Sequence, residues 1–415
     1  MKPSLAHMAI FFTIISAARA QVVPAATGPA GLAVSGTLHY DLRYTQTARF
    51  STGNAGDSQM NTLSGEVTYA NANSARPFSL AYSGGKTWTL SGANGEAGVY
   101  QHLMASQGFL RRSWAFNLND NVSYMPLAPT TGFSGIPGVG NLPGTPGTPA
   151  QPILTLNTRS VTNQAGANFT RRLDRATNLG LTGSYGIIRF LDGNGLETNS
   201  LQAGPQITRR LNAQNSIIGQ YSISHFNYVG STVSMGTQSA QFGFTRMWNR
   251  RLKTSATAGP EWIHGSAGSN IPSSTNLTMN ANATYDARSM SLTLGYTQSA
   301  SGGAGVATQV GVHNKDVFAG LTRRQGKNLT FGFTGSYMRT QGLQQQQAGV
   351  TNSKYGGVSA TQRWGRYIEV FANYTAIQQS LSLAIITSNS NAISGLSQVI
   401  GFGIGYSPRE MRLKK

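Results

Sequence analysis

The sequence predicts an all-β protein: a transmembrane antiparallel up-and-down β-barrel of about 18 strands, with sixteen as the other even count considered. Three observations lead to this fold class. Apolar and polar residues alternate from about residue 32 onward, the connections between the resulting strands are alternately short and long, and the tryptophans fall near strand ends. All three are typical of a sheet that closes on itself inside a membrane.

The composition removes other classes of protein. The 415 residues carry 32 Lys and Arg against 13 Asp and Glu, and a formal charge of +19 is by itself typical of a nucleic-acid binder. However, charged residues make up only 11% of the chain, against about 25% in ordinary soluble domains. We therefore expect no nucleic-acid partner. Cysteine is absent, which excludes disulfides and thiolate metal sites.

The N-terminus predicts export. Lys2 precedes an apolar run at residues 8–17, and Ala18-Arg19-Ala20 fits a small-residue cleavage site. We assign residues 1–20 to a signal peptide, 21–31 to a periplasmic N-terminal segment, 32–407 to the barrel and 408–415 to a basic periplasmic tail. No later apolar stretch is long enough for a transmembrane helix.

The strands are read from alternation with period two. Leu292, Leu294 and Tyr296, for example, alternate with Ser, Thr and Gly. Eighteen strands are counted in this way. They begin near residues 32, 61, 76, 99, 112, 163, 177, 200, 215, 238, 252, 276, 289, 313, 328, 355, 367 and 396, give or take a few positions.

A recurring strand end supports this arrangement. Phe169-Thr-Arg-Arg172, Ile207-Thr-Arg-Arg210 and Leu321-Thr-Arg-Arg324 each end one strand shortly before the next begins. Connections after even strands are short, and those after odd strands are long and rich in Gly, Ser and Asn. This alternation is typical of periplasmic turns and extracellular loops. A propeller or solenoid is disfavoured because the repeated unit is a hairpin; a soluble secreted β-sandwich array remains the alternative fold.

Aromatic residues offer a second test of the barrel. On this strand map every tryptophan lies near one end of a strand, as an interface girdle requires. The interface aromatics are Trp88, Trp114, Trp248, Trp262 and Trp364.

Residues 32–406 as a whole resemble the bacterial outer-membrane β-barrel porins. The hairpin repeat is also similar to uncharacterised porin-like barrels associated with polysaccharide secretion. The resemblance implies a Gram-negative outer-membrane channel, not an enzyme, for passive diffusion of small polar solutes. An outer-membrane component of exopolysaccharide secretion and a structural or adhesive barrel are the alternatives. Two features depart from the porin pattern: a basic tail follows Tyr406, and the third long connection has no acidic residue.

That third connection, residues 125–162, is the longest in the chain. It holds seven of the fifteen prolines, and Pro and Gly at this density prevent regular structure. Two interpretations stay open: an inward constriction or plug, and an extracellular loop outside the pore.

The pore lining is expected to be mostly neutral Asn, Gln, Ser, Thr and Gly, with acid and base nearly balanced. A catalytic use of His39 with Asp41 or Glu66 is disfavoured because the alternating strand spreads these groups along the wall. We expect no catalytic residue, cofactor or metal. The pore-lining candidates are His39, Asp41, Arg43, Glu66, Arg189, Glu261, Asp316, Arg339 and Glu369.

Most of the positive charge lies at the short-turn ends of the strands. Two roles are open for this rim: pairing with outer-membrane lipid headgroups, and steering small anionic solutes or a polymer from polysaccharide export machinery into the barrel. The oligomeric state is not predicted. The periplasmic basic rim consists mainly of Arg111, Arg112, Arg171, Arg172, Arg209, Arg210, Arg250, Arg251, Arg323 and Arg324.

Overall fold

The computed structural model describes residues 34–52, 57–71, 75–92, 98–125, 159–191, 196–302, 310–344, 349–381, 394–408 and 411–414. The expected signal peptide, the N-terminal segment at 21–31 and nearly all of the connection at 125–162 lie outside these residues. Among the described residues there is no helix long and apolar enough to cross a membrane.

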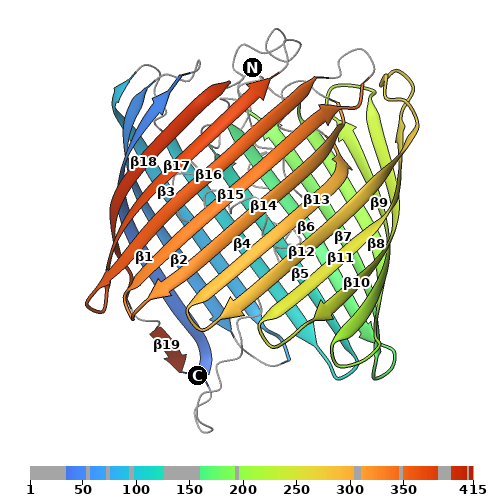
Figure 1. Ribbon diagram of the computed structural model, residues 1–415, viewed down its shortest axis with the longest axis horizontal. Coiled ribbons are helices and arrows are strands. Elements are labelled where there is room, and N and C mark those ends of the chain that lie inside the picture. Colours follow the sequence, from blue (N-terminus) through green and yellow to red (C-terminus); the bar gives the residue numbers. More distant parts are fainter. Residues whose placement is uncertain are drawn as a thin grey trace, which may run out of the picture.

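The described chain forms one sheet of long antiparallel strands (Figure 1). The barrel strands are β1 (Val34–Ser51), β2 (Ser58–Asn71), β3 (Phe78–Gly92), β4 (Gly98–Leu110), β5 (Trp114–Met125), β6 (Ser160–Arg172), β7 (Thr177–Phe190), β8 (Thr198–Arg210), β9 (Asn215–Tyr228), β10 (Ser234–Met247), β11 (Leu252–Gly265), β12 (Ser274–Ala287), β13 (Met290–Ser301), β14 (Val312–Gln325), β15 (Leu329–Gly342), β16 (Val350–Trp364), β17 (Ile368–Leu381) and β18 (Gly395–Tyr406). The expected count of about 18 strands is confirmed.

The sheet closes between its first and last long strands. β1 pairs on one side with β2 and on the other with β18, where Leu42 lies opposite Tyr406 and Ser51 opposite Ser397. Each of the strands β2 to β17 pairs with its two neighbours in sequence. A single closed sheet contradicts the alternative of packed β-sandwiches, because in the barrel the lumen takes the place of the core between two sheets.

The two faces of the wall have opposite character. Large apolar side chains on the outward face are exposed, including Leu42 (51%), Leu201 (55%) and Phe402 (62%). Their inward neighbours along the strand are small or polar and often buried, such as Thr45 at 2%. Since an exposed apolar band is stable only in contact with lipid, the outward face spans the membrane.

Three consecutive short turns share one hydrogen-bond pattern. Asp174 Oδ1 accepts from the backbone N–H of Ala176 (2.5 Å) and Thr177 (2.7 Å). Asn212 Oδ1 accepts likewise from the residues two and three positions further on, both at 2.9 Å, and Asn249 does so at 2.8 Å. Side chains of this type favour tight turns because they replace the missing backbone acceptors. This pattern is a common feature of the turns that follow β6, β8 and β10.

The C-terminal segment adds one feature to the predicted barrel. After β18, the short strand β19 (Met411–Lys414) pairs antiparallel with the beginning of β1, Val34 opposite Lys414 and Leu38 opposite Met411. β1 is the longest strand of the sheet, and β19 covers the part of it that extends beyond β18. Part of the expected basic tail therefore belongs to the sheet.

Candidate functional site: the barrel lumen

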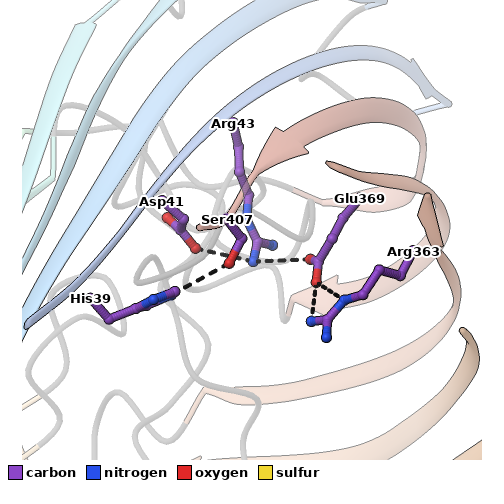
Figure 2. Close-up of polar contacts among 6 residues, drawn as sticks. All are labelled: His39, Asp41, Arg43, Arg363, Glu369 and Ser407. Carbon is purple, nitrogen blue, oxygen red and sulfur yellow. Dashed lines mark hydrogen bonds and ion pairs between the residues drawn. The ribbon is translucent and has the colours of Figure 1, made fainter. Parts of the chain in front are cut away.

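A cluster of charged side chains lies on the inner wall near the short-turn end, where β1 and β17 flank β18 (Figure 2). Arg43 Nη2 lies 3.3 Å from Asp41 Oδ2 and 3.9 Å from Glu369 Oε2. Glu369 Oε1 also accepts from Arg363 Nη2 at 2.6 Å. Acids and bases thus alternate along the cluster, and we call these four residues the seam cluster.

Glycines on β18 make the seam cluster possible. Gly405 lies between Arg43 on β1 and Glu369 on β17 in the strand register, so two side chains from strands about 10 Å apart meet over it. A Cβ on Gly405 would lie 3.3 Å from Arg43 Cγ. One step along β18, the ring of Phe371 occupies the space over Gly403, and Arg43 Cζ lies 5.8 Å from the centre of that ring.

His39 and Glu66 lie beside the seam cluster. His39 Nε2 is 3.4 Å from Ser407 Oγ, whereas the carboxylate of Asp41 faces Arg43 (Figure 2). Glu66 lies directly opposite Asp41 in the β1–β2 register and is on the same inward face. The structure therefore brings together five of the nine predicted lining residues: His39, Asp41, Arg43, Glu66 and Glu369.

Two further predicted lining residues face inward nearer the long-loop ends. Glu261 is 4% exposed, and its Oε2 accepts from the backbone N–H of Ala300 at 2.9 Å. Asp316 is 1% exposed and lies on the inward face of β14. Both carboxylates are far along their strands from the seam cluster, so the predicted charges form no single group.

The prediction for Arg189 and Arg339 is wrong, because both residues face outward. Arg189 shares a face with Tyr185, and its Nε lies 3.6 Å from Glu197 Oε2. Arg339 shares a face with Tyr337, while the intervening Met338 faces inward and is 2% exposed. Near a strand end the outward face leaves the hydrocarbon, so a charge there no longer marks the inward face.

The predicted basic rim lies at the short-turn end, and strand alternation divides it. An Arg-Arg pair ends β6 and β8 and immediately precedes the last residue of β14. In each pair the first residue shares the outward face with an apolar residue two positions earlier: Phe169, Ile207 or Leu321. The second residue therefore belongs to the inward face. The outward members are Arg171, Arg209 and Arg323, and the inward members are Arg172, Arg210 and Arg324. Arg111, Arg112, Arg250 and Arg251 lie in the turns between strands.

The predicted interface aromatics lie toward both ends of the strands. Trp114 begins β5, Trp248 follows β10 and Trp364 ends β16, all at short turns. Trp248 donates from Nε1 to Thr254 Oγ1 at 2.9 Å, and Arg246 Cζ lies 4.0 Å from the centre of its ring. Trp88 and Trp262 lie on outward faces toward the long-loop ends.

The middle of the wall is lined by hydrogen-bonded amides and hydroxyls. Gln241 on β10 is bonded to side chains of three other strands, β9, β11 and β12. It accepts from Gln220 (2.8 Å) and Thr257 (2.9 Å) and donates to Thr278 (3.3 Å). On the other side, inward residues of β4, β5 and β6 form a second network, in which Asn168 donates to Asn119 Oδ1 at 3.2 Å. The neutral polar lining predicted from the sequence is thus held in place by its own contacts.

An apolar cluster inside the long-loop end was missed by the sequence analysis. Phe226, Tyr228, Met235 and Ile263 project inward and pack against Ile271 of the loop between β11 and β12. Gln344, which follows β15, donates to the Ser269 carbonyl at 3.0 Å. This bond connects the β11–β12 loop to the end of β15. The signal was available, because these residues put large apolar groups on the otherwise polar face. The predicted lining residues also omitted Arg49, which faces inward on β1 and is 3% exposed.

A closed sheet with an apolar outer face, short turns at one end and a polar, partly charged inner wall is the architecture of porin-like outer-membrane β-barrels. No protein-family model matches this sequence, and no curated protein matches it. Among solved structures, the chain is similar to Pseudomonas aeruginosa OccK5 (OpdH), with 9% identity, a TM-score of 0.47 and coverage of 91% of this chain and 98% of that one.

Two further solved structures give similar values. P. aeruginosa OccK2 (OpdF) in complex with glucuronate has 11% identity and a TM-score of 0.47, with 91% and 99% of the two chains covered. Acinetobacter baumannii OccAB3 has 10% identity and a TM-score of 0.44, with the same coverage of 91% and 99%. At such identities, what the lumen of this chain can accept depends on its own lining residues.

Proposed function

We propose that this protein is an outer-membrane channel for passive diffusion of small polar solutes, with no chemical step. The observation that carries the proposal is the closed barrel of eighteen strands with a polar inner face. Barrels of sixteen to eighteen strands usually leave an aqueous lumen. Amides and hydroxyls along the wall exchange hydrogen bonds with water, so a hydrated solute can pass without losing its polar contacts.

The charged residues set a preference within this function. His39, Asp41, Arg43, Glu66 and Glu369 line the part of the lumen near the short-turn end, and this group holds three acids against one arginine and one histidine. The inward arginines at the short-turn mouth itself add only positive charge. A mouth of one sign raises the local concentration of oppositely charged solutes. We therefore propose a preference for small anions over cations of the same size, with the outward arginines and the tryptophans anchoring the barrel in lipid.

A second candidate uses the same feature. The inward arginines would also draw in an anionic polysaccharide that export machinery delivers from the periplasm. The two functions differ in what stops when the gene is deleted: uptake of small solutes in the first, release of polymer in the second. Normal polymer release from the deletion strain would exclude the export function, and the diffusion channel would then be the one remaining candidate.

The test is to refold the purified barrel and record it in planar bilayers, followed by solute entry into proteoliposomes. We expect discrete conductance steps and faster entry of glucuronate than of glucose, with glucosamine slowest, because the three sugars differ mainly in charge. A barrel that stays silent at all voltages would exclude the channel. Equal entry of the three sugars would exclude the charge preference and leave the channel itself intact.

A further inference from the structure

Three basic side chains lie together on the lipid-facing side of the barrel, near the long-loop ends of three neighbouring strands: Lys315 on β14, Arg339 on β15 and Lys354 on β16. We propose that this group, the outward basic cluster, binds the phosphates of a phosphorylated glycolipid of the lipid A type in the outer leaflet. β14, β15 and β16 lie side by side at the front of Figure 1. The site is independent of the lumen and of the solute that passes through it.

Strand alternation places all three bases on the outward face. Lys315 precedes Asp316, which faces inward at 1% exposure, and Arg339 follows the inward Met338 at 2%. Lys354 lies between the inward residues Ser353 (3%) and Tyr355 (9%). Each base is exposed, whereas its buried neighbours point into the barrel.

The register brings the three bases within reach of one headgroup. Lys315 lies directly opposite Arg339. Lys354 lies opposite Tyr337, and so diagonal to Arg339, at a Cα separation of about 7–8 Å. Because the strands lean as Figure 1 shows, a step from β14 to β15 moves toward the long-loop end. Lys354 lies two residues from Asn352, the register partner of Arg339, in the direction of the short-turn end of β16. With strands about 4.8 Å apart and tilted about 40°, the three Cα atoms differ in height by about 3 Å.

The charge of the cluster is not cancelled by nearby acids. Arg189, an outward base on β7, has an ion pair with Glu197. Within the described residues, none of the three clustered bases has an ion pair with an acid, and the acids on the neighbouring strands, Asp316 and Glu369, face inward. A compact group of unneutralised bases at a membrane surface attracts anionic headgroups.

The surroundings place the cluster at the headgroup level of the outer leaflet. Tyr337, one outward position below Arg339, donates its hydroxyl to Asn352 Oδ1 at 3.0 Å, and outward Tyr296 and Tyr374 make similar bonds to Gln298 and Gln398. Tyrosines of this kind mark the membrane–water interface. Long loops are extracellular in such barrels. The outer leaflet there consists mainly of phosphorylated glycolipid, whose sugar hydroxyls also suit the amide of Asn352.

The test measures lipid binding to the detergent-purified full chain by native mass spectrometry. The test variant is Lys315→Gln/Arg339→Gln. Its control is Lys86→Gln/Arg189→Gln, which removes one outward Lys from β3 and one outward Arg from β7, away from the outward basic cluster. For bisphosphorylated lipid A we expect the test variant to bind roughly thirtyfold more weakly than wild type. The control should bind like wild type, and all three proteins should keep the migration of the folded barrel and the same conductance.

Two further probes identify the headgroup. Dephosphorylated lipid A should bind wild type as weakly as bisphosphorylated lipid A binds the test variant, because the phosphates are the proposed contact. Phosphatidylglycerol should bind wild type more weakly than lipid A, since it has one phosphate and no sugar. Equal lipid A binding by the test variant and wild type, or equal binding of phosphatidylglycerol and lipid A, would overturn the proposal.

Discussion

Arg43 Nη2 on β1 lies 3.9 Å from Glu369 Oε2 on β17, although β18 runs between the two strands. The contact exists because β18 presents Gly401, Gly403 and Gly405 to the lumen, so no side chain of β18 separates its neighbours. The place where the barrel closes is therefore also the place where the lining charges meet. Closure and lining charge can be tested separately, because different residues carry them.

The glycine face of β18 should be necessary for stable closure. A Cβ on Gly403 would overlap the Phe371 ring and lie 2.6 Å from the Tyr44 carbonyl oxygen, which the β1–β18 pairing holds in place. We expect Gly403→Ala to lower the free energy of unfolding by about 1–3 kcal/mol. The control is Gly356→Ala, where a Cβ would meet nothing within 4 Å. Equal urea midpoints for the two variants in detergent would contradict this account.

Glu369 should limit the positive potential at the short-turn end of the lumen. It contacts both Arg43 and Arg363, so Glu369→Gln leaves both bases without this carboxylate. We expect the anion-to-cation permeability ratio, measured from reversal potentials in a salt gradient, to rise by about twofold at low salt and by less when salt screens the charge. Glu197→Gln removes an acid from outside the lumen and should leave the ratio unchanged. A similar rise in both variants would mean that the seam cluster has no special effect.

The two arginines of each strand-end pair should have different roles. Arg172→Gln/Arg210→Gln/Arg324→Gln and Arg171→Gln/Arg209→Gln/Arg323→Gln remove the same charge from the same end of the same strands. We expect only the inward triple variant to lose anion preference, by roughly two- to fivefold at low salt. The outward triple variant should fold less efficiently into bilayers containing anionic phospholipid. If both variants change permeability alike, the division by strand alternation does not hold.

The loop between β11 and β12 should restrict the long-loop mouth. Ile271 is 7% exposed and packs on the inward cluster of Met235 and Ile263. Ile271→Asn should weaken this packing by about 2–4 kcal/mol and increase both the conductance and its fluctuations. Val229→Asn, at a loop position that is 44% exposed, is the control. Unchanged conductance in Ile271→Asn would show that this loop does not limit flow.

The turn between β6 and β7 should depend on pH, unlike the two turns that follow. Hydrogen bonds from the backbone N–H of Ala176 and Thr177 lower the pKa of Asp174 below its ordinary value of 3.8. The ionised carboxylate therefore stabilises the turn at pH values above the ordinary pKa of 3.8, and this stabilisation is lost as the pH falls through the lowered pKa. Amide exchange at Thr177 should accelerate at low pH beyond its intrinsic change, whereas exchange at Asn215, held by Asn212, should not. Asp174→Asn should abolish the difference.

The sequence alone determined the fold class and the strand map. Alternation in stretches such as Leu292–Tyr296 and the order of short and long connections were sufficient for eighteen strands, because both depend only on local periodicity and spacing. The largest difference among the strand starts is at β16, which begins at Val350 instead of near residue 355. The basic short-turn end was predicted for the same reason, since the arginine pairs recur at strand ends.

Only the tertiary structure decided which side chains meet. Arg43 and Glu369 are distant in sequence, and their contact depends on closure and on the missing side chains of β18. Arg189 and Arg339 were placed inward from their charge, but their strands place them outward, where the wall leaves the hydrocarbon and a base is tolerated. Ile271 meets Met235 and Ile263 because a loop folds inward. Periodicity specifies the face of each residue, whereas contacts depend on register, tilt and closure, which are properties of the whole barrel.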